Sequence, residues 1–528
     1  MGLDQLEVLF IDCQTTGMRP PRGHVLELAW ARGTAASSLT IHSELIRLPA
    51  GESIPKMVRE ITGMNDEDLA EARTEADVFA DFSTGALQPP EPRVAVIHYA
   101  QFEKPFLMDL FERYNQCNEL PLQVICSYQL CKRLLPGLPS QNIRGASGFF
   151  GAPTSHIQRA GPHVQATQRI WQGLLEKLRE QGVNDLAALN LFLDEKAKVK
   201  TARYEYRLDK LKRLELPDKP GIYRMLAKSG DVLYVGKATS LKARVNSYFR
   251  GQKNRDRFKL EMLAQVWDLR VTECKSALEA ALLESDEIKR YNPPYNIVLK
   301  RGRRHLLFYN RSFDAAAGEQ SLEFPHGPFR NSNWIEHLRL VHQSLGRDEF
   351  LQIFFNPIPA NIMAEGFASF CQQHGLDRLK VKSPRSLLAF GLWLHKHHVE
   401  PTELVEEAIG EDDLAESADE ERNPTPEEVA AKLDRLFRRA AAEYLRGKKL
   451  TRLLNSDIEL KTKYGRSRLR FRGGKMDAAA EANGDYPSTS AAMPQNGRST
   501  PWVGMQIDDF DRMSILLSEL AKNEHRIC

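Results

Sequence analysis

The chain has 528 residues, of which 42% are hydrophobic and 27% charged, and its formal net charge is +3. One hydrophobic core does not ordinarily serve a chain of this length, so we expect several domains. The composition is typical of a globular protein, and the absence of an apolar run of about 18 residues excludes a membrane-spanning helix. No basic segment precedes an apolar one at the start, so no signal peptide is expected.

The seven cysteines are scattered along the sequence without a CxxC pair. Disulfide frameworks and structural zinc sites use more closely spaced cysteines. The pattern favours reduced thiols and predicts a cytoplasmic location.

The first third of the sequence alternates short apolar runs with amphipathic stretches. Strands are predicted at 7–11, 25–30, 39–48 and 93–98, and helices at 56–61 and 165–179. Strands mixed with helices in this way predict an α/β domain over residues 1–184.

Three motifs of this region resemble those of DEDD 3′–5′ exonucleases related to the proofreading subunit of bacterial DNA polymerase. The first motif keeps Asp12 but has Gln14 in place of its glutamate. The second ends in Glu103 rather than aspartate, and the third has Gln158 and His163 in place of the base histidine and the final aspartate.

The resemblance implies an RNase H-like fold and a site for two metal ions. Two adjacent divalent ions need several anionic oxygens to offset their repulsion, and Asp12 and Glu103 alone are too few. We therefore expect an inactive exonuclease-like domain that holds single-stranded DNA, docks a partner or orients another domain.

A basic connector is predicted over 185–214, and a compact α+β domain follows over 215–304. Strands at 221–226 and 232–235 are expected to form a hairpin around Gly230. Helices are predicted over 241–248, capped by Thr239 or Ser240, and over 275–290.

The segments Gly221-Ile222-Tyr223 and Tyr234-Val235-Gly236-Lys237 resemble the GIY-YIG nuclease domain of the UvrC and Cho family. The later segment ending in Tyr295-Asn296 resembles the closing segment of that domain. The resemblance implies a catalytic set that consists of Tyr223, Tyr234, Lys237, Arg244, Tyr248 and Glu284.

The chemistry of this set follows from its residue types. Glu284 is the carboxylate at the motif position, which implies one hard divalent cation, Mg²⁺ or Mn²⁺, completed by water and phosphate. Arg244 would hold the scissile phosphate through two donors. One tyrosine would take a proton from the attacking water, with Tyr223 preferred as the base over Tyr234.

A phenol with an ordinary pKa of about 10 is a poor base at neutral pH. We expect Lys237, Arg244 and the metal ion to depress this pKa. Asp286 and Glu287 are expected to be surface carboxylates.

The C-terminal part is predicted to be mostly helical over 305–475, disordered over 476–500 and amphipathic over 501–528. Helices are expected near 349–355, 364–374, 385–398 and 427–454. The run His395-Lys396-His397-His398 is interpreted as a solvated helix face rather than a metal site.

Basic residues gather in two places. Residues 215–304 hold 19 basic and 11 acidic residues, and residues 432–475 hold 15 basic and four acidic ones. Solvated helix faces explain about half of such basic runs. Next to a nuclease motif, however, a basic run favours binding to a DNA backbone.

The expected protein is a multidomain α/β enzyme, a Cho-like endonuclease of nucleotide excision repair that cuts damaged double-stranded DNA on the 3′ side of a lesion. With no ATPase P-loop, it would depend on UvrB loaded by UvrA. Only Cys371 and Cys528 follow the nuclease domain, so no iron–sulfur cluster is expected. Two alternatives stay open: a bifunctional protein with an active exonuclease, and a non-catalytic DNA-binding scaffold.

Overall fold

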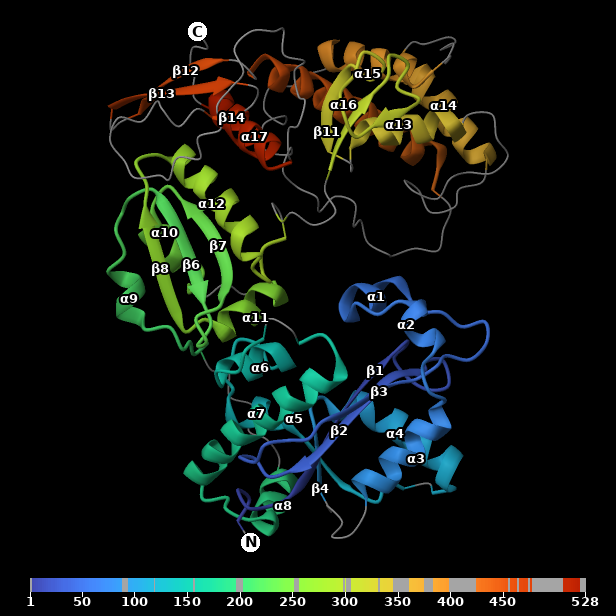
Figure 1. Ribbon diagram of the computed structural model, residues 1–528, viewed down its shortest axis with the longest axis vertical. Helices are drawn as coiled ribbons and strands as arrows, with labels where there is room; N and C mark the ends of the chain where they lie inside the picture. The colour runs from blue at the N-terminus through green and yellow to red at the C-terminus, as the bar shows by residue number, and fades with distance from the viewer. Residues whose placement is uncertain are drawn as a thin grey trace. The chain divides into compact units, whose positions relative to one another are not determined.

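The computed structural model describes most of the chain (Figure 1). The described residues are 2–87, 94–117, 119–154, 157–195, 203–250, 256–297, 300, 305–330, 333–344, 360–374, 383–397, 424–453, 456–462, 465–472, 475–476 and 507–522. Within them, no helix has the length and apolar character needed to cross a membrane. The chain divides into two compact units, Met1–Glu273 with Pro293–Asn296, and Cys274–Asn292 with Ile297–Cys528.

The first unit begins with a five-stranded mixed sheet. Its strands are β1 (Val8–Thr15), β2 (Val25–Gly33), β3 (His42–Leu45), β4 (Val94–Ile97) and β5 (Gln123–Cys126). They lie in the order β3-β2-β1-β4-β5, with β1 antiparallel to β2 and parallel to β4. This is the strand order of an RNase H-like sheet, so the predicted exonuclease-type α/β fold is confirmed.

Both faces of this sheet carry helices, which explains the nearly continuous apolar runs of its strands. Successive residues of a strand point to opposite faces, so Phe10 and Ile11 of β1 enter two different cores. One core contains residues of α3 (Glu75–Ala86) and α4 (Ala100–Asn115). The other contains residues of α5 (Ser127–Leu134), α6 (Ile143–Phe149) and α7 (Ala160–Glu180). Short helices α1 (Lys56–Thr62) and α2 (Asp66–Ala70) lie between β3 and α3 in the sequence.

One helix assigned to the connector belongs to this domain instead. α8 (Leu186–Asp194) places Leu189 in the core that holds Trp171. The connector predicted over 185–214 therefore begins after α8. Its residues 196–202 lie outside the described residues, and α9 (Lys210–Leu214) ends it.

A second, smaller sheet follows in the same unit (Figure 1). β6 (Gly221–Leu226), β7 (Val232–Ala238) and β8 (Asp268–Glu273) are antiparallel in the order β7-β6-β8. The predicted hairpin is confirmed, and Gly230 in its turn has a φ of +91°, which favours glycine. α10 (Leu241–Ser247) begins as predicted at Ser240, whose hydroxyl accepts a hydrogen bond from the Ala243 amide.

The two sheets of the first unit are connected by direct packing as well as by the connector. α11 (Arg257–Gln265) packs against α6, and Ala264 lies in the same core as Trp171. Trp267 Nε1 donates to the Gly148 carbonyl at 2.8 Å, and Gln265 hydrogen bonds to Thr154. Apolar contacts and paired polar groups thus hold the second sheet against the N-terminal domain.

The second unit is mostly helical, as predicted. Its helices are α12 (Ala277–Tyr291), α13 (Trp334–Ser344), α14 (Ala360–Gln373), α15 (Pro384–His397), α16 (Pro426–Leu453) and α17 (Ile507–Lys522). Two small sheets were not predicted, one of β9 (Leu306–Tyr309), β10 (Ala316–Ala317) and β11 (His326–Arg330), the other of β12 (Asp457–Thr462), β13 (Gly465–Arg472) and β14 (Lys475–Met476). The predicted helix at 349–355 and the predicted disorder beyond Met476 lie outside the described residues.

α17 packs on α12 through apolar and charged contacts. Phe510 and Met513 share a buried cluster with Leu278 of α12. The buried Lys289 ammonium lies 2.9 Å from an Asp511 carboxylate oxygen. This ion pair and its apolar surroundings hold the last described helix against a helix more than 200 residues earlier in the sequence.

Candidate nuclease site

Three tyrosines gather on the small sheet of the first unit. Tyr223 lies on β6 and Tyr234 on β7, offset in register because Tyr223 pairs with Gly236. Their ring centroids are 6.1 Å apart, and those of Tyr223 and Tyr248 are 6.0 Å apart. The Tyr223 and Tyr248 hydroxyls form a hydrogen bond of 2.9 Å. The structure therefore brings together three of the predicted catalytic side chains.

Gly236 makes this arrangement possible. It lies opposite Tyr223 in the β6–β7 register, and a Cβ atom added to it would overlap the Tyr223 hydroxyl and ring. The backbone φ of Gly236 is not in the left-handed region, so its conformation does not require glycine. The close packing of the Tyr223 phenol against β7 does require it.

Arg244 joins the cluster from α10. Its guanidinium carbon lies 5.4 Å from the Tyr248 ring centroid, and the side chain hydrogen bonds to Tyr223. Burial lowers the pKa of Arg244, but the Tyr223 and Tyr248 phenols raise it by more. The net shift is upward, so the guanidinium keeps its charge. Arg244 is exposed, as a group that contacts a phosphate must be. Lys237 is exposed at the end of β7.

The protein groups around Tyr223 do not produce the expected depression of its pKa. The side chain is 0% exposed. Burial and the neighbouring phenols of Tyr234 and Tyr248 raise its pKa well above the ordinary value, and the opposing effect of Arg244 is smaller. Tyr234 and Tyr248, in contrast, are only half-buried. The base role therefore fits the half-buried phenols better than Tyr223.

Asn296 fixes the strand that carries Tyr234, and its contact was not predicted. Its side-chain oxygen accepts from the Val235 amide and its side-chain nitrogen donates to the Val235 carbonyl, both at 2.9 Å. The side chain is buried, and it pairs with β7 as a further strand would. The only signal in the sequence is the position of Asn296 after a Pro-Pro-Tyr segment.

Glu284, the predicted metal ligand, lies half-buried on α12. This helix is part of the second unit, whereas the tyrosines are part of the first. Glu284 in the metal site therefore stays a prediction. The expectation of a surface carboxylate is wrong for Glu287, which is only 8% exposed. The Asp286 side chain is 42% exposed, and it accepts hydrogen bonds from Arg512 at 2.9 and 3.1 Å.

The described residues hold no group of three or more histidine, cysteine, aspartate or glutamate side chains close enough to enclose a metal ion. A single glutamate fits a hard cation that keeps most of its waters, as Mg²⁺ does. It does not fit a structural zinc site, which takes four protein ligands. The donor set therefore agrees with the predicted Mg²⁺ or Mn²⁺.

Three of the residues expected at a degenerate exonuclease site, Asp12, Gln14 and His163, meet at β1. His163 Nδ1 of α7 lies 3.1 Å from both carboxylate oxygens of Asp12. Gln14 Nε2 donates to Asp12 at 3.1 Å. Burial lowers the pKa of His163 but the Asp12 carboxylate raises it more, so the net shift is upward. The Asp12 carboxylate therefore favours the protonated form of His163, at the position where the resemblance would place a carboxylate.

Glu103 completes this cluster, whereas Gln158 does not. Glu103 lies at the start of α4 and is 4% exposed, and burial followed by the Asp12 charge raises its pKa well above the ordinary range. Gln158 is exposed in the segment before α7, and no hydrogen bond among the described residues joins it to Asp12. The cluster thus brings together two carboxyl groups and a histidine, and the pKa of one of the carboxyl groups, that of Glu103, is raised.

Comparisons with known proteins match the part of the chain that contains the smaller sheet. Residues 219–297 match the model of the UvrC-like GIY-YIG domain. A Mycobacterium tuberculosis protein with the provisional name bifunctional exonuclease/endonuclease is 28% identical over 304 residues, 56% of this chain and 45% of that protein. The UvrABC system protein C of a Psychrobacter species is 44% identical over 112 residues, 21% of this chain and 18% of that protein.

Among solved structures, the GIY-YIG N-terminal endonuclease domain of Thermotoga maritima UvrC, bound to magnesium, is 31% identical. The match covers 17% of this chain and 94% of that domain, with a TM-score of 0.15. The chain spans less than half the length of the curated relatives described above. The match to the family model covers one domain of this chain. Residues 219–297 form a UvrC-like GIY-YIG domain.

Proposed function

We propose that this protein is a metal-dependent DNA endonuclease whose cutting centre is the GIY-YIG domain. The observation that carries the proposal is the cluster of Tyr223 and Tyr234 on the small sheet with Arg244 and Tyr248 of α10 and its C-terminal end, all inside the matched residues. A buried phenol with two half-buried phenols and a permanent cation around it serves proton transfer and phosphate binding.

Each residue has a separate task. Arg244 binds the non-bridging oxygens of the scissile phosphate, and its contact with the Tyr248 ring fixes its direction. Tyr234 or Tyr248 first loses its own proton to solvent, and the phenolate then takes a proton from the attacking water and becomes the neutral phenol. Tyr223 orients the Tyr248 oxygen through their hydrogen bond. Glu284 would hold the Mg²⁺ or Mn²⁺ ion, which supplies charge stabilisation of the phosphate when bound.

The finer proposal is a role in nucleotide excision repair. The relatives that share the domain include UvrABC system proteins. We infer that the protein makes one cut on the 3′ side of a lesion and acts after UvrA has loaded UvrB on the damage. A duplex with one lesion, labelled in turn at each end, tests this in the presence of UvrA, UvrB, ATP and Mg²⁺. One 3′-side cut that requires UvrB is expected, and equal cutting of damaged and undamaged duplex would contradict the proposal.

The bifunctional alternative is the second candidate, and the comparisons favour it over the repair assignment. The relative with the longest match given above carries both nuclease activities in its provisional name. The charge of the N-terminal site counts against an active exonuclease, since Asp12 is paired with His163 and Glu103 has a raised pKa. An assay with a 3′-labelled single strand distinguishes a bifunctional protein from one with a single cutting centre. Stepwise shortening of the strand in Mg²⁺ or Mn²⁺ establishes the bifunctional protein, and an unchanged strand establishes a single cutting centre.

A further inference from the structure

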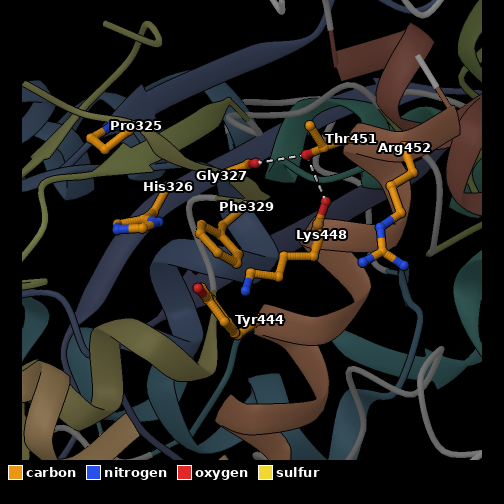
Figure 2. A pocket seen from close by; sticks show the side chains of 9 residues that line it. Pro325, His326, Gly327, Phe329, Tyr444, Lys448, Thr451 and Arg452 are labelled. Carbon is orange, nitrogen blue, oxygen red and sulfur yellow. Dashed lines mark hydrogen bonds between the residues drawn. The ribbon is translucent and has the colours of Figure 1, made fainter. Parts of the chain in front are cut away.

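A hollow lies between a strand and a helix of the second unit (Figure 2). It has a volume of about 360 Å³. Its lining comes from β11 and the residues before it and from the last turns of α16: Pro325, His326, Gly327, Phe329, Tyr444, Gly447, Lys448, Thr451 and Arg452. None of these nine side chains is acidic, so the hollow has basic and aromatic walls.

The helical wall has a regular origin. Tyr444, Lys448 and Arg452 recur at every fourth residue of α16 and therefore lie along one face of the helix. Gly447 lets that face approach β11, because a Cβ atom there would lie 3.2 Å from a Phe329 ring carbon. Thr451 donates to the Gly447 carbonyl at 2.9 Å and lies 3.4 Å from the Gly327 carbonyl, which links the two walls.

Among the described residues, the two cations of the hollow have no acidic partner. Within the described part of the chain, no carboxylate lies within 4.0 Å of the Lys448 ammonium or the Arg452 guanidinium. Lys448 extends toward Tyr444 and Phe329 in Figure 2, and its ammonium lies 4.9 Å from the Tyr444 ring centroid. In the same view, the Arg452 guanidinium lies to the right of Lys448, on the side away from His326.

The opposite wall is aromatic and also lies in a positive field. The His326 ring stacks on Phe313 at 4.8 Å with an interplanar angle of 15°. Burial lowers the pKa of His326, and the cations Arg385, Lys448 and Arg311 lower it further. A solvated helix face would explain two lysines or arginines at this spacing, but it would not explain an aromatic wall and several cations around one cavity.

We propose that this hollow binds a phosphate group of a DNA strand through Lys448 and Arg452, with the adjoining base or sugar against Tyr444 and His326. Unneutralised cations supply the affinity for a phosphate, and aromatic faces stack bases without regard to sequence. The proposal rests on the proposed function for its choice of DNA as substrate. It adds a contact that lies outside residues 219–297, from a stretch of the sequence that is rich in basic residues.

The test measures binding and not cutting, so that an inactive GIY-YIG centre leaves it intact. Fluorescence anisotropy of a labelled single strand and of a labelled duplex is recorded with the full chain in EDTA over a range of NaCl concentrations. The variants are Lys448→Gln with Arg452→Gln, the conservative Lys448→Arg, and Lys449→Gln as the matched control, since Lys449 is exposed but does not line the hollow.

The double variant should bind several-fold more weakly at every sequence tested, and the slope of log affinity against log salt should fall by about 1. Lys448→Arg and Lys449→Gln should bind like the wild type, and all variants should keep the wild-type melting temperature. Wild-type affinity and slope in the double variant would overturn the proposal. So would a result in which deoxyadenosine monophosphate binds the wild type and not the double variant while DNA affinity is unchanged, because the phosphate would then come from a free nucleotide.

Discussion

The Tyr223 hydroxyl lies 2.9 Å from the Tyr248 hydroxyl, and Tyr223 is fully buried whereas Tyr248 is not. Tyr248 can therefore release its own proton to solvent, and its phenolate can accept a proton from a water near the exposed edge of this pair, with Tyr223 as the fixed partner. The buried phenol has a raised pKa, so it acts as a hydrogen-bonding support at neutral pH and not as an anionic base.

Tyr223→Phe should lower the cutting rate by about 100-fold or more, the range typical of a disturbed acid–base group. The ring stays and the hydrogen bonds of the hydroxyl to Tyr248 and Arg244 are lost, so stability should fall by about 1–3 kcal/mol. Rates of plasmid nicking and a urea unfolding curve check the two effects. The control is Tyr291→Phe, which changes an exposed tyrosine and should leave both unchanged. Wild-type nicking by Tyr223→Phe would remove Tyr223 from the mechanism.

Gly236→Ala should abolish cutting, because the added methyl group would overlap the Tyr223 hydroxyl and displace the ring. The expected loss of stability is about 1–3 kcal/mol, as for overpacking in a core. Gly85→Ala is the matched control. Gly85 lies in α3 with open space around its Cβ position, so that change should stabilise the chain by up to about 1 kcal/mol. Normal cutting by Gly236→Ala would show that the phenol is not held against β7.

The N-terminal domain should lose stability on acidification because of His98. Its ring bonds to Ser127 Oγ at 2.9 Å and to the Gln141 carbonyl at 3.0 Å, and burial lowers its pKa to about 4. The unfolded chain binds this proton near pH 6.5, so the contribution of the neutral ring is complete above that pH. It is lost as pH falls toward 4, by about 3 kcal/mol in total.

Urea unfolding of His98→Gln between pH 7 and pH 4 checks this contribution. Glutamine can keep both hydrogen bonds but does not titrate, so the pH dependence of its stability should be smaller than that of the wild type. His397→Gln, an exposed histidine in the second unit, should retain the wild-type slope. Equal slopes for wild type and His98→Gln would show that the ring is not neutral in the folded domain.

Asp12→Asn should not affect cutting by the GIY-YIG domain, because Asp12 pairs with His163 and Gln14 inside the N-terminal domain. The purified wild type should leave a 3′-labelled single strand at its full length in Mg²⁺ and in Mn²⁺. Gel analysis of the labelled strand decides the matter. Shortening by the wild type that disappears in Asp12→Asn would establish an active exonuclease.

Local signals predicted the parts of the fold that depend on nearby residues. The turn around Gly230 predicted the β6–β7 hairpin, and the apolar run before Asp12 predicted the central strand of the larger sheet. β8 was missed because only three of its six residues are apolar or β-branched, and it has a charged residue at each end.

Contacts between distant segments could not be predicted. The Tyr223 pKa was expected to fall because its basic neighbours are visible in the sequence, whereas its complete burial is not. The ion pair of Asp286 with Arg512 could not be predicted, because the two residues are 226 positions apart in the sequence. His163 was recognised as the replacement of a ligand, but its pairing with Asp12 depends on how α7 packs against β1.

The central claim is that the GIY-YIG domain cuts DNA with one metal ion held by Glu284. Nicking of supercoiled plasmid by Glu284→Gln in Mg²⁺ and in Mn²⁺, with duplex binding measured in EDTA, tests it most directly. The control is Glu273→Gln, which removes an exposed carboxylate that pairs with Lys219. The account predicts weak nicking by the wild type and the control, no nicking by Glu284→Gln in either metal, and equal DNA affinity for all three. Nicking by Glu284→Gln at the wild-type rate in Mg²⁺ would contradict it.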